Sequence, residues 1–285
     1  VNVTSDKCYE NREWVWGYRE NDPLGGHDPY SASKACAEIV FNAYLNSFLS
    51  QYGNTIPISV LLQAQDEREG GRVIAKYGDT IPISGESGSS LRISQIGAGS
   101  CRAGNAIGGG DWGLDRLIPD CVRALSGGRA IAIRNPHAIR PWQHVLELLS
   151  GYLWLGACLW EEPGRYSGAW NFGPDNTADF TVAEVVTRFV QTWGAGEWQD
   201  LSEPSAVHEA ATLRLCCDKA AANLGWRNAL AMLQAIDLTA EWYKMFYNGA
   251  APEAVYLLNK KQIAEYVKTA RETTLRWAEI NRKLP

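Results

Sequence analysis

The chain has 285 residues, of which 46% are apolar and 21% are charged, so it is long enough to form one large domain or two joined ones. This composition excludes disorder for most of the chain, and no apolar run approaches the roughly 18 residues of a membrane span. The net charge of −5 argues against nucleic acid as a partner. The seven cysteines show no Cys-x-x-Cys spacing, which disfavours zinc and redox motifs and is typical of buried thiols in a cytoplasmic protein.

The first predicted element is a short apolar strand at residues 1–3, which ends in the polar turn Thr4-Ser5-Asp6-Lys7. A run of this kind is typical of a protein interior, so we expect the sequence to begin inside a longer protein. A loop rich in glycine and proline follows at 21–26. From Pro29 the apolar residues recur with helical spacing, which predicts a helix to about residue 45.

Residues 49–97 depart from this pattern. The stretches Tyr52–Ser59 and Tyr77–Ser84 match at seven of their eight positions. Two copies are too few for a solenoid, and surface loops tolerate insertions well, so we interpret 49–97 as an inserted segment.

The rest of the chain alternates between predicted strands and helices. A strand end opens into a glycine-rich loop at 102–112, and short strands are predicted at 130–134 and 169–173. Helices are predicted at 114–125, 144–160, 181–193, 218–224, 230–247 and 253–282. This alternation predicts an α/β chain with a mostly parallel sheet.

Tyr30 and Lys34 are the first candidate catalytic residues. Side chains four residues apart lie on one face of a helix, so the ammonium of Lys34 would stabilise the phenolate of Tyr30 and make it a usable base. The spacing alone is weak evidence, because Tyr and Lys are common in helices. Upstream, Ser5, Asp6 and Lys7 follow a strand, and ligands of open α/β sheets bind at the carboxyl ends of strands.

Four stretches together resemble the extended short-chain dehydrogenase/reductases and, within them, the sugar-nucleotide 4,6-dehydratases. They are Val3–Asn11 with its Ser-Asp-Lys, Asp28–Glu38 with its Tyr-x-x-x-Lys, Arg102–Trp112 and Arg134–Val145. Trp170–Pro174 and His208–Ala210 add to the likeness. The resemblance implies an incomplete Rossmann-like parallel sheet with a smaller C-terminal α/β substrate domain, NAD as cofactor and CDP-glucose as substrate.

The resemblance also implies roles for the residues at the strand end and on the helix. Tyr30 would take the proton of the sugar 4-hydroxyl, and Lys34 would tune Tyr30 and hold the nicotinamide ribose. Asp6 would protonate the leaving water, and Lys7 would act as the base at C5 or assist it. Ser5 would hydrogen-bond the 4-oxygen.

Substrate contacts are implied for residues further along the chain. Asn105 would meet the pyrophosphate, and Arg134 and Arg140 would bind the diphosphate or the nucleotide. Glu209 and Trp112 are weaker candidates for contacts with the base or ribose. We interpret His144 as a core or loop histidine. The resemblance further implies pairing of copies, as a homodimer or homotetramer, through the helix of Tyr30.

The sequence departs from this family in one respect. Its members begin with a Gly-x-x-Gly-x-x-Gly turn that cradles the NAD pyrophosphate, and no such spacing occurs here. We therefore divide the chain into 1–48 (the end of a Rossmann-like domain), 49–97 (the insertion), 98–175 (last Rossmann strands and substrate loops) and 176–285 (a mostly helical substrate domain). Two alternatives stay open: an inactive remnant that binds a nucleotide sugar, and a nucleotide-sugar epimerase of the same fold.

Overall fold

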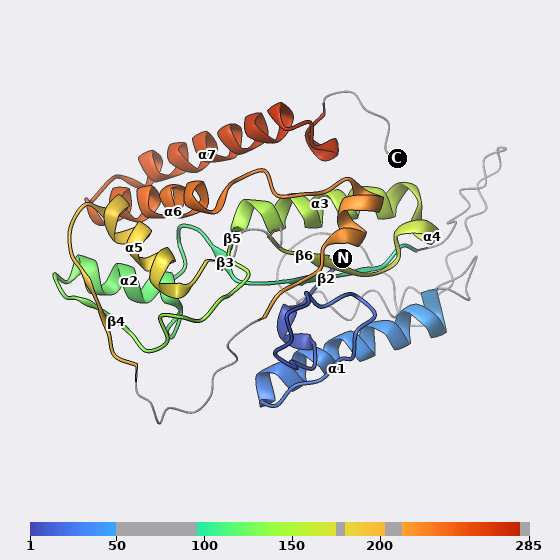
Figure 1. The fold of residues 1–285 in the computed structure, drawn as a ribbon. Coiled ribbons are helices and arrows are strands. Elements are labelled where there is room, and N and C mark those ends of the chain that lie inside the picture. Colours follow the sequence, from blue (N-terminus) through green and yellow to red (C-terminus); the bar gives the residue numbers. More distant parts are fainter. Residues whose placement is uncertain (50–95, 175–179, 203–212, 280–285) are drawn as a thin grey trace, which may run out of the picture.

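A three-stranded parallel sheet lies at the centre of the computed structural model, which describes residues 1–49, 96–174, 180–202 and 213–279 (Figure 1). Its strands are β1 (Asn2–Val3), β2 (Gly99–Ala103) and β6 (Gly168–Phe172), in the order β1-β2-β6. Val3 lies opposite Cys101, and Cys101 opposite Trp170. The carboxyl ends of all three strands therefore meet at one edge, where the first predicted site residues follow β1.

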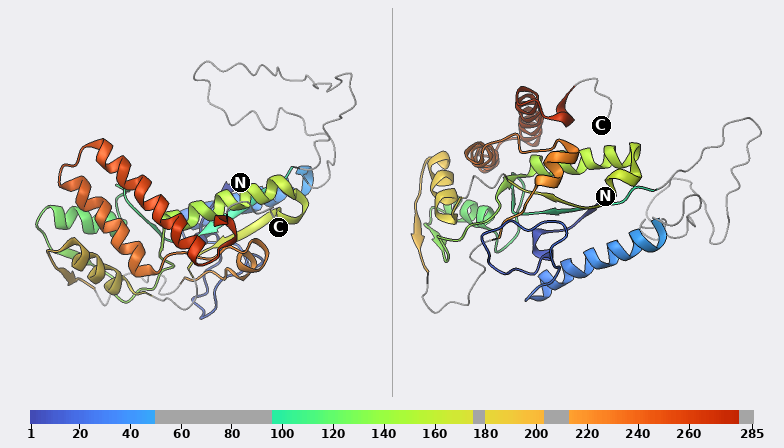
Figure 2. Two further views of the ribbon diagram at one scale, coloured as in Figure 1. Left: turned by 90° about the horizontal axis from the view of Figure 1, so that it is seen from above. Right: turned by 45° about the vertical axis from the view of Figure 1, so that its right-hand side comes forward.

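Helices cover both faces of this sheet, α1 (Pro29–Tyr44) on one and α3 (Val145–Glu161) on the other (Figures 1 and 2). The carboxylate of Asp28 accepts the N–H of Ser31, and Pro29 has no N–H to leave unpaired, so α1 begins there. One π-helical turn, η2 (Leu45–Leu49), continues α1. Between α3 and the sheet lies one apolar core, which includes Leu148, Leu155, Trp170, Phe172 and Trp226.

A second group of elements packs around its own core. Two short parallel strand pairs belong to it, β3 (Ala106–Ile107) with β5 (Gln143–His144) and β4 (Ile131–Ile133) with β7 (Trp198–Asp200). Its helices are α2 (Leu117–Ser126), α5 (Val182–Trp193) and α6 (Met232–Tyr247). The remaining elements are η1 (Asp6–Cys8), α4 (Pro163–Tyr166), η5 (Ala220–Leu224), α7 (Pro252–Glu272) and η6 (Arg276–Ala278). The parallel pairing and the alternation of strands and helices confirm the predicted α/β fold class.

The predicted helix boundaries differ from the observed ones where the backbone leaves the helical region. The helix expected from residue 114 begins at Leu117, because Asp115 has a φ of 57° and Arg116 is extended. The tail expected to be helical to 282 leaves the helix at Glu272, and Thr274 has a φ of 56°. The helix predicted from residue 181 begins there, with Thr181 as its N-cap in a capping box with Glu184.

The cysteines are mostly buried, as the sequence predicted. Cys8, Cys101, Cys121, Cys158 and Cys216 are buried and Cys217 is half-buried. The prediction is wrong for Cys36, which is exposed because its position on α1 faces away from the sheet. The near-repeat at 52–84 lies outside the described residues.

Candidate active site

The turn after β1 carries Ser5, Asp6 and Lys7 at the carboxyl edge of the sheet. Ser5 caps the short helix η1, and its hydroxyl accepts the N–H of Lys7 at 3.2 Å and donates to Asp6 Oδ1 at 2.9 Å. Thr4 N–H donates to the carbonyl of Cys101 at 2.8 Å, which continues the pairing of β1 with β2 by one residue. The turn is therefore fixed to the sheet at the place where ligands of open α/β sheets bind.

Asp6 is a buried carboxyl with one unused oxygen. Its side chain is 3% exposed, and within the described ranges Oδ2 has no hydrogen-bond partner. Burial raises the pKa of Asp6. The hydrogen bond from Ser5 and the charges of Lys7 and Arg140 lower this pKa, but by less, so it stays above its usual value. A carboxyl of this kind holds its proton at a higher pH than a free aspartic acid, which suits a proton donor.

Tyr30 and Lys34 lie on α1, which packs against η1. Tyr30 is in the first turn and is 57% exposed, so its phenol can be reached from solvent. The ammonium of Lys34 lies 5.4 Å from the centroid of the Tyr30 ring. The charge of Lys7 also acts on Asp28, the residue that caps α1, and helps to lower its pKa after the hydrogen bonds from Ser31. The structure thus packs the helix that carries Tyr30 and Lys34 against the turn that carries Asp6 and Lys7.

One cation beside Tyr30 was not among the predicted site residues. Arg116 donates to Asp111 at 2.9 Å, and this contact raises the pKa of the guanidinium, with a smaller contribution from the phenol of Tyr30. Arg116 therefore lies within electrostatic range of Tyr30. The sequence held no signal for this, because the proximity depends on how the 108–116 loop folds back.

The predicted substrate residues are more widely spread. Asn105 is half-buried just beyond β2, and its carbonyl accepts the N–H of Gln143 at 3.0 Å. Arg140 is half-buried and acts on Asp6 through its charge. Arg134 is exposed at the end of β4, which lies in the second group of elements, away from α1 (Figure 1). Glu209 lies outside the described residues.

Trp112 belongs to an aromatic cluster with α6. Its ring lies 5.4 Å from that of Tyr243 and 5.0 Å from that of Phe246. A Cβ on Gly109 would lie 2.1 Å from Trp242, so this glycine is required by packing against α6. Gly110 has a φ of 81°. The glycine-rich loop therefore packs against the indole of Trp242 at Gly109.

His144 is a buried structural residue, as predicted. Its Nδ1 accepts the N–H of Leu146 at 3.3 Å and so caps α3, and within the described part of the chain Nε2 has no partner. Burial lowers the pKa of His144 to about 4. The ring is therefore neutral near pH 7.

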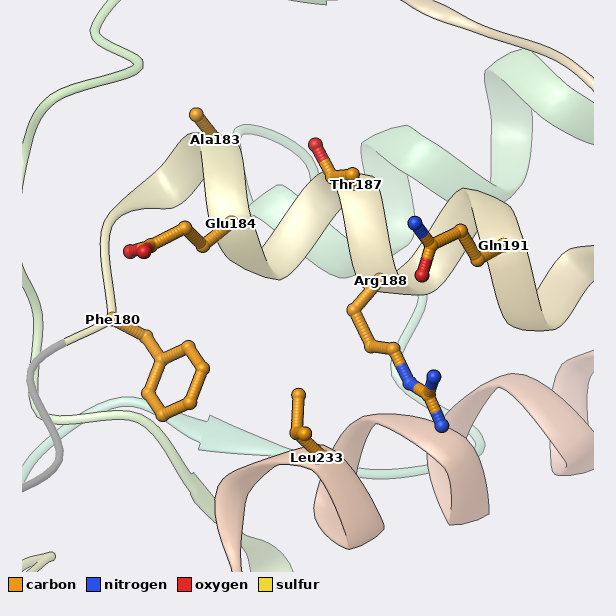
Figure 3. A pocket seen from close by; sticks show the side chains of 7 residues that line it. All are labelled: Phe180, Ala183, Glu184, Thr187, Arg188, Gln191 and Leu233. Atoms are coloured by element: carbon orange, nitrogen blue, oxygen red, sulfur yellow. The ribbon is translucent and has the colours of Figure 1, made fainter.

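A pocket between α5 and the start of α6 is lined by none of these residues (Figure 3). Its lining comes from α5, the residues before it and α6: Phe180, Ala183, Glu184, Thr187, Arg188, Gln191 and Leu233. Its charged side chains are already engaged, since Arg188 binds Asp237 and Glu184 binds Thr181. We therefore assign it no part in the site.

Across residues 1–49, 96–174, 180–202 and 213–279, no group of three or more His, Cys, Asp or Glu side chains is placed to hold a metal ion. Nor does any helix in these ranges combine the length and the apolar character of a membrane span.

Comparison with known proteins agrees with the motifs. No family model matches the chain. It is 40% identical over 267 residues to CDP-glucose 4,6-dehydratase of Salmonella typhimurium. The chain is a relative of this dehydratase. The match covers 94% of the chain and 63% of the Salmonella protein, so the chain spans less than two thirds of that relative.

Solved structures share the fold at lower identity. A dTDP-glucose 4,6-dehydratase from Streptomyces venezuelae, with NAD bound, has a TM-score of 0.60 at 19% identity, over 88% of this chain and 61% of its own. The corresponding enzyme of Bacillus anthracis, also with NAD, has a TM-score of 0.57 at 17% identity, over 85% and 60%. UDP-glucuronic acid 4-epimerase of Bacillus cereus has a TM-score of 0.59 at 11% identity, over 86% and 61%. The chain thus shares its fold with nucleotide-sugar dehydratases and epimerases alike.

Proposed function

We propose that this chain carries the acid, the base and part of the substrate site of an NAD-dependent sugar-nucleotide 4,6-dehydratase that acts on CDP-glucose. The observation that carries the proposal is Asp6: a buried carboxyl with a raised pKa and a free oxygen, on a turn packed against the helix of Tyr30 and Lys34. Interconversion of epimers at C4 needs no acid for the loss of water, whereas a 4,6-dehydration does. The 40% identity to a CDP-glucose 4,6-dehydratase supports the same choice.

The residues fit one end of the cofactor. Lys34 is half-buried with its ammonium above the Tyr30 ring, a position suited to hold a ribose hydroxyl beside the phenol. Among the described residues, Trp242 occupies the space beside Gly109 of the glycine-rich loop. This glycine therefore does not line a cradle for the pyrophosphate of the cofactor. When bound, NAD would accept hydride from C4 of the sugar and return it to C6.

The side chains would then move the protons of the reaction. Tyr30 takes the 4-hydroxyl proton as C4 becomes a ketone, and Lys34 stabilises the phenolate. The ketone acidifies the C5 proton, which Lys7 would remove as a neutral amine or help to remove. A proton would return to C5 from the same side chain when hydride reaches C6. Asp6 gives its proton to the departing 6-hydroxyl, which leaves as water. Ser5, which donates to Asp6, orients that carboxyl and is proposed to hydrogen-bond the 4-oxygen.

Several groups are proposed to hold the substrate. Asn105 lies just beyond β2 at the carboxyl edge, and Arg140 lies between β4 and β5 and acts on Asp6 through its charge. Both would meet the diphosphate, because guanidinium and amide groups bind phosphate oxygens. For Arg134 we propose a contact with the diphosphate or the nucleotide, as the resemblance implies. For Trp112 and Glu209 we propose contacts with the base or ribose. The domain limits at 48, 97 and 175 and the cytoplasmic location also remain proposals.

Pairing of two copies is proposed through α1. Ile39, Val40 and Tyr44 are 56%, 55% and 49% exposed on this helix, an apolar content that a second copy of the same face would cover. Light scattering should give twice the chain mass, and an Ile39→Lys variant should give the single mass.

The test of function is product formation. The chain is incubated with NAD⁺ and CDP-glucose, and the 4-keto-6-deoxy product is followed by its absorbance in alkali. An Asp6→Asn variant should lose about 100-fold or more of the rate. Asp120→Asn, which changes a surface ion pair with Arg123, is the matched control and should keep it. Binding of CDP-glucose without any product would favour the inactive remnant instead.

A further inference from the structure

A buried ion pair joins the two halves of the candidate site. Glu38 lies on α1 four residues after Lys34, and its carboxylate is fully buried. Arg102 lies on β2 with 1% of its surface exposed, and its guanidinium donates to Glu38 Oε2 at 2.8 Å. Burial alone would raise the pKa of Glu38, but the hydrogen bonds from Arg102, Ser100 and Thr4 outweigh it and hold the pKa low. Glu38 is therefore a charged anchor between α1 and the sheet.

The second oxygen of Glu38 reaches the strand end. Glu38 Oε1 accepts the hydroxyl of Thr4 and that of Ser100. Thr4 is the residue immediately before Ser5, Asp6 and Lys7, whereas Ser100 lies within β2. A single carboxylate on the helix of Tyr30 thus binds Thr4, the residue that precedes the turn of Ser5, Asp6 and Lys7.

Arg102 contacts Tyr9, which follows the same turn. Its guanidinium donates to the Tyr9 hydroxyl at 2.9 Å and to the carbonyl of Glu20 at 2.9 Å. Tyr9 is the residue at which η1 ends, and its hydroxyl donates in turn to Asn171 at 2.7 Å. The turn is therefore clamped on both sides by one ion pair that also fixes α1.

We propose that Glu38 and Arg102 are positioning residues, which hold the turn of Asp6 in register with the helix of Tyr30 through Thr4 on one side and Tyr9 on the other. The relevance of this register to catalysis rests on the proposed function. A displacement of reacting groups by about 1 Å can cost roughly 100-fold in rate, so a fixed register between acid and base has catalytic value. In this proposal, contact with the substrate is not required of Glu38, Arg102, Thr4 or Tyr9, the four residues of the clamp.

Two cysteines make the clamp measurable without any turnover. Cys8 lies in the turn itself, and Cys101 lies next to Ser100 on β2. Both thiols are fully buried, and burial raises the pKa of each to about 12, so the two are chemically matched. The rate at which a small alkylating reagent labels each one, mapped by peptide mass, reports local opening. The exposed Cys36 is the internal reference.

The test compares Thr4→Val with Ser100→Ala, which remove one hydroxyl each from the same oxygen of Glu38. In Thr4→Val the labelling of Cys8 should become about tenfold faster or more, with Cys101 unchanged within about twofold. In Ser100→Ala the labelling of Cys8 should stay within about twofold of the wild-type rate. Thr4→Ser, which restores a hydroxyl, should return Cys8 to its original rate.

Equal acceleration of Cys8 and Cys101 in Thr4→Val would overturn the proposal, because it would show a general loss of stability. So would an equal opening of the turn in Ser100→Ala. If the wild type forms the dehydrated product, kcat of Thr4→Val should fall about tenfold with KM within about twofold. If the wild type forms none, the proposed function fails while the labelling still decides on the clamp.

Discussion

Replacing Arg102 by methionine tests how much the buried ion pair contributes to stability. Arg102→Met leaves the Glu38 carboxylate, fully buried, with the Thr4 and Ser100 hydroxyls as its partners. Breaking a buried pair from one side costs about 3–5 kcal/mol, because a buried charge loses its compensation. For a chain of this size that corresponds to a fall in Tm of roughly 6–10 °C. Urea denaturation followed by circular dichroism at pH 7 measures the free energy of unfolding directly.

The double variant Glu38→Met/Arg102→Met separates charge from packing. With both charges gone, Tyr9 keeps its bond to Asn171 and Thr4 can still donate to Cys101. The hydroxyl of Ser100 and the carbonyl of Glu20 each lose the partner that the ion pair gave them. Its stability should return to within about 1–2 kcal/mol of the wild type. A loss below about 1 kcal/mol in Arg102→Met, or no recovery in the double variant, would show that the pair is not a compensated buried charge.

Two other predictions concern stability. The pKa of His144 is lowered to about 4 in the folded state, whereas an unfolded histidine titrates near about 6.5. The unfolded state therefore binds the proton first as the pH falls, and stability should drop by about 3 kcal/mol between pH 6.5 and 4. His144→Gln should flatten that part of the urea-midpoint profile, and an unchanged slope would refute the assignment. Gly109→Ala should cost about 1–3 kcal/mol, since its Cβ would lie 2.1 Å from Trp242. Gly156→Ala, whose Cβ has room on α3, should be neutral or stabilising in the same thermal melts.

The sequence predicted the starts of those helices that have a local signal next to them. Asp28 before Pro29 sets the start of α1, and Thr181 with Glu184 sets the start of α5. Such caps act within a few residues, so they are visible without the fold. The position of Tyr30 and Lys34 on one helix face follows from spacing alone.

The features that the sequence did not predict depend on contacts between distant segments. Glu38 meets Arg102 across 64 residues of chain, and a glutamate on a helix is otherwise most often solvated. Trp112 packs against Tyr243 of α6, which lies 131 residues further along the chain. The indole of Trp112 therefore packs against α6 in addition to any contact that it makes with substrate. The start of α2 was misplaced for a similar reason, because Asp115 adopts a positive φ where the loop turns back toward Arg116 and Asp111.

One site is proposed to oxidise C4, to remove water across C5 and C6, and to return the same hydride to C6. CDP-glucose labelled with deuterium at C4 tests it most directly, with NAD⁺ added and the product examined by NMR. We expect a 4-keto-6-deoxy sugar that carries deuterium at C6. Formation of the C4 epimer, with deuterium still at C4 and the 6-hydroxyl intact, would contradict this and indicate an epimerase.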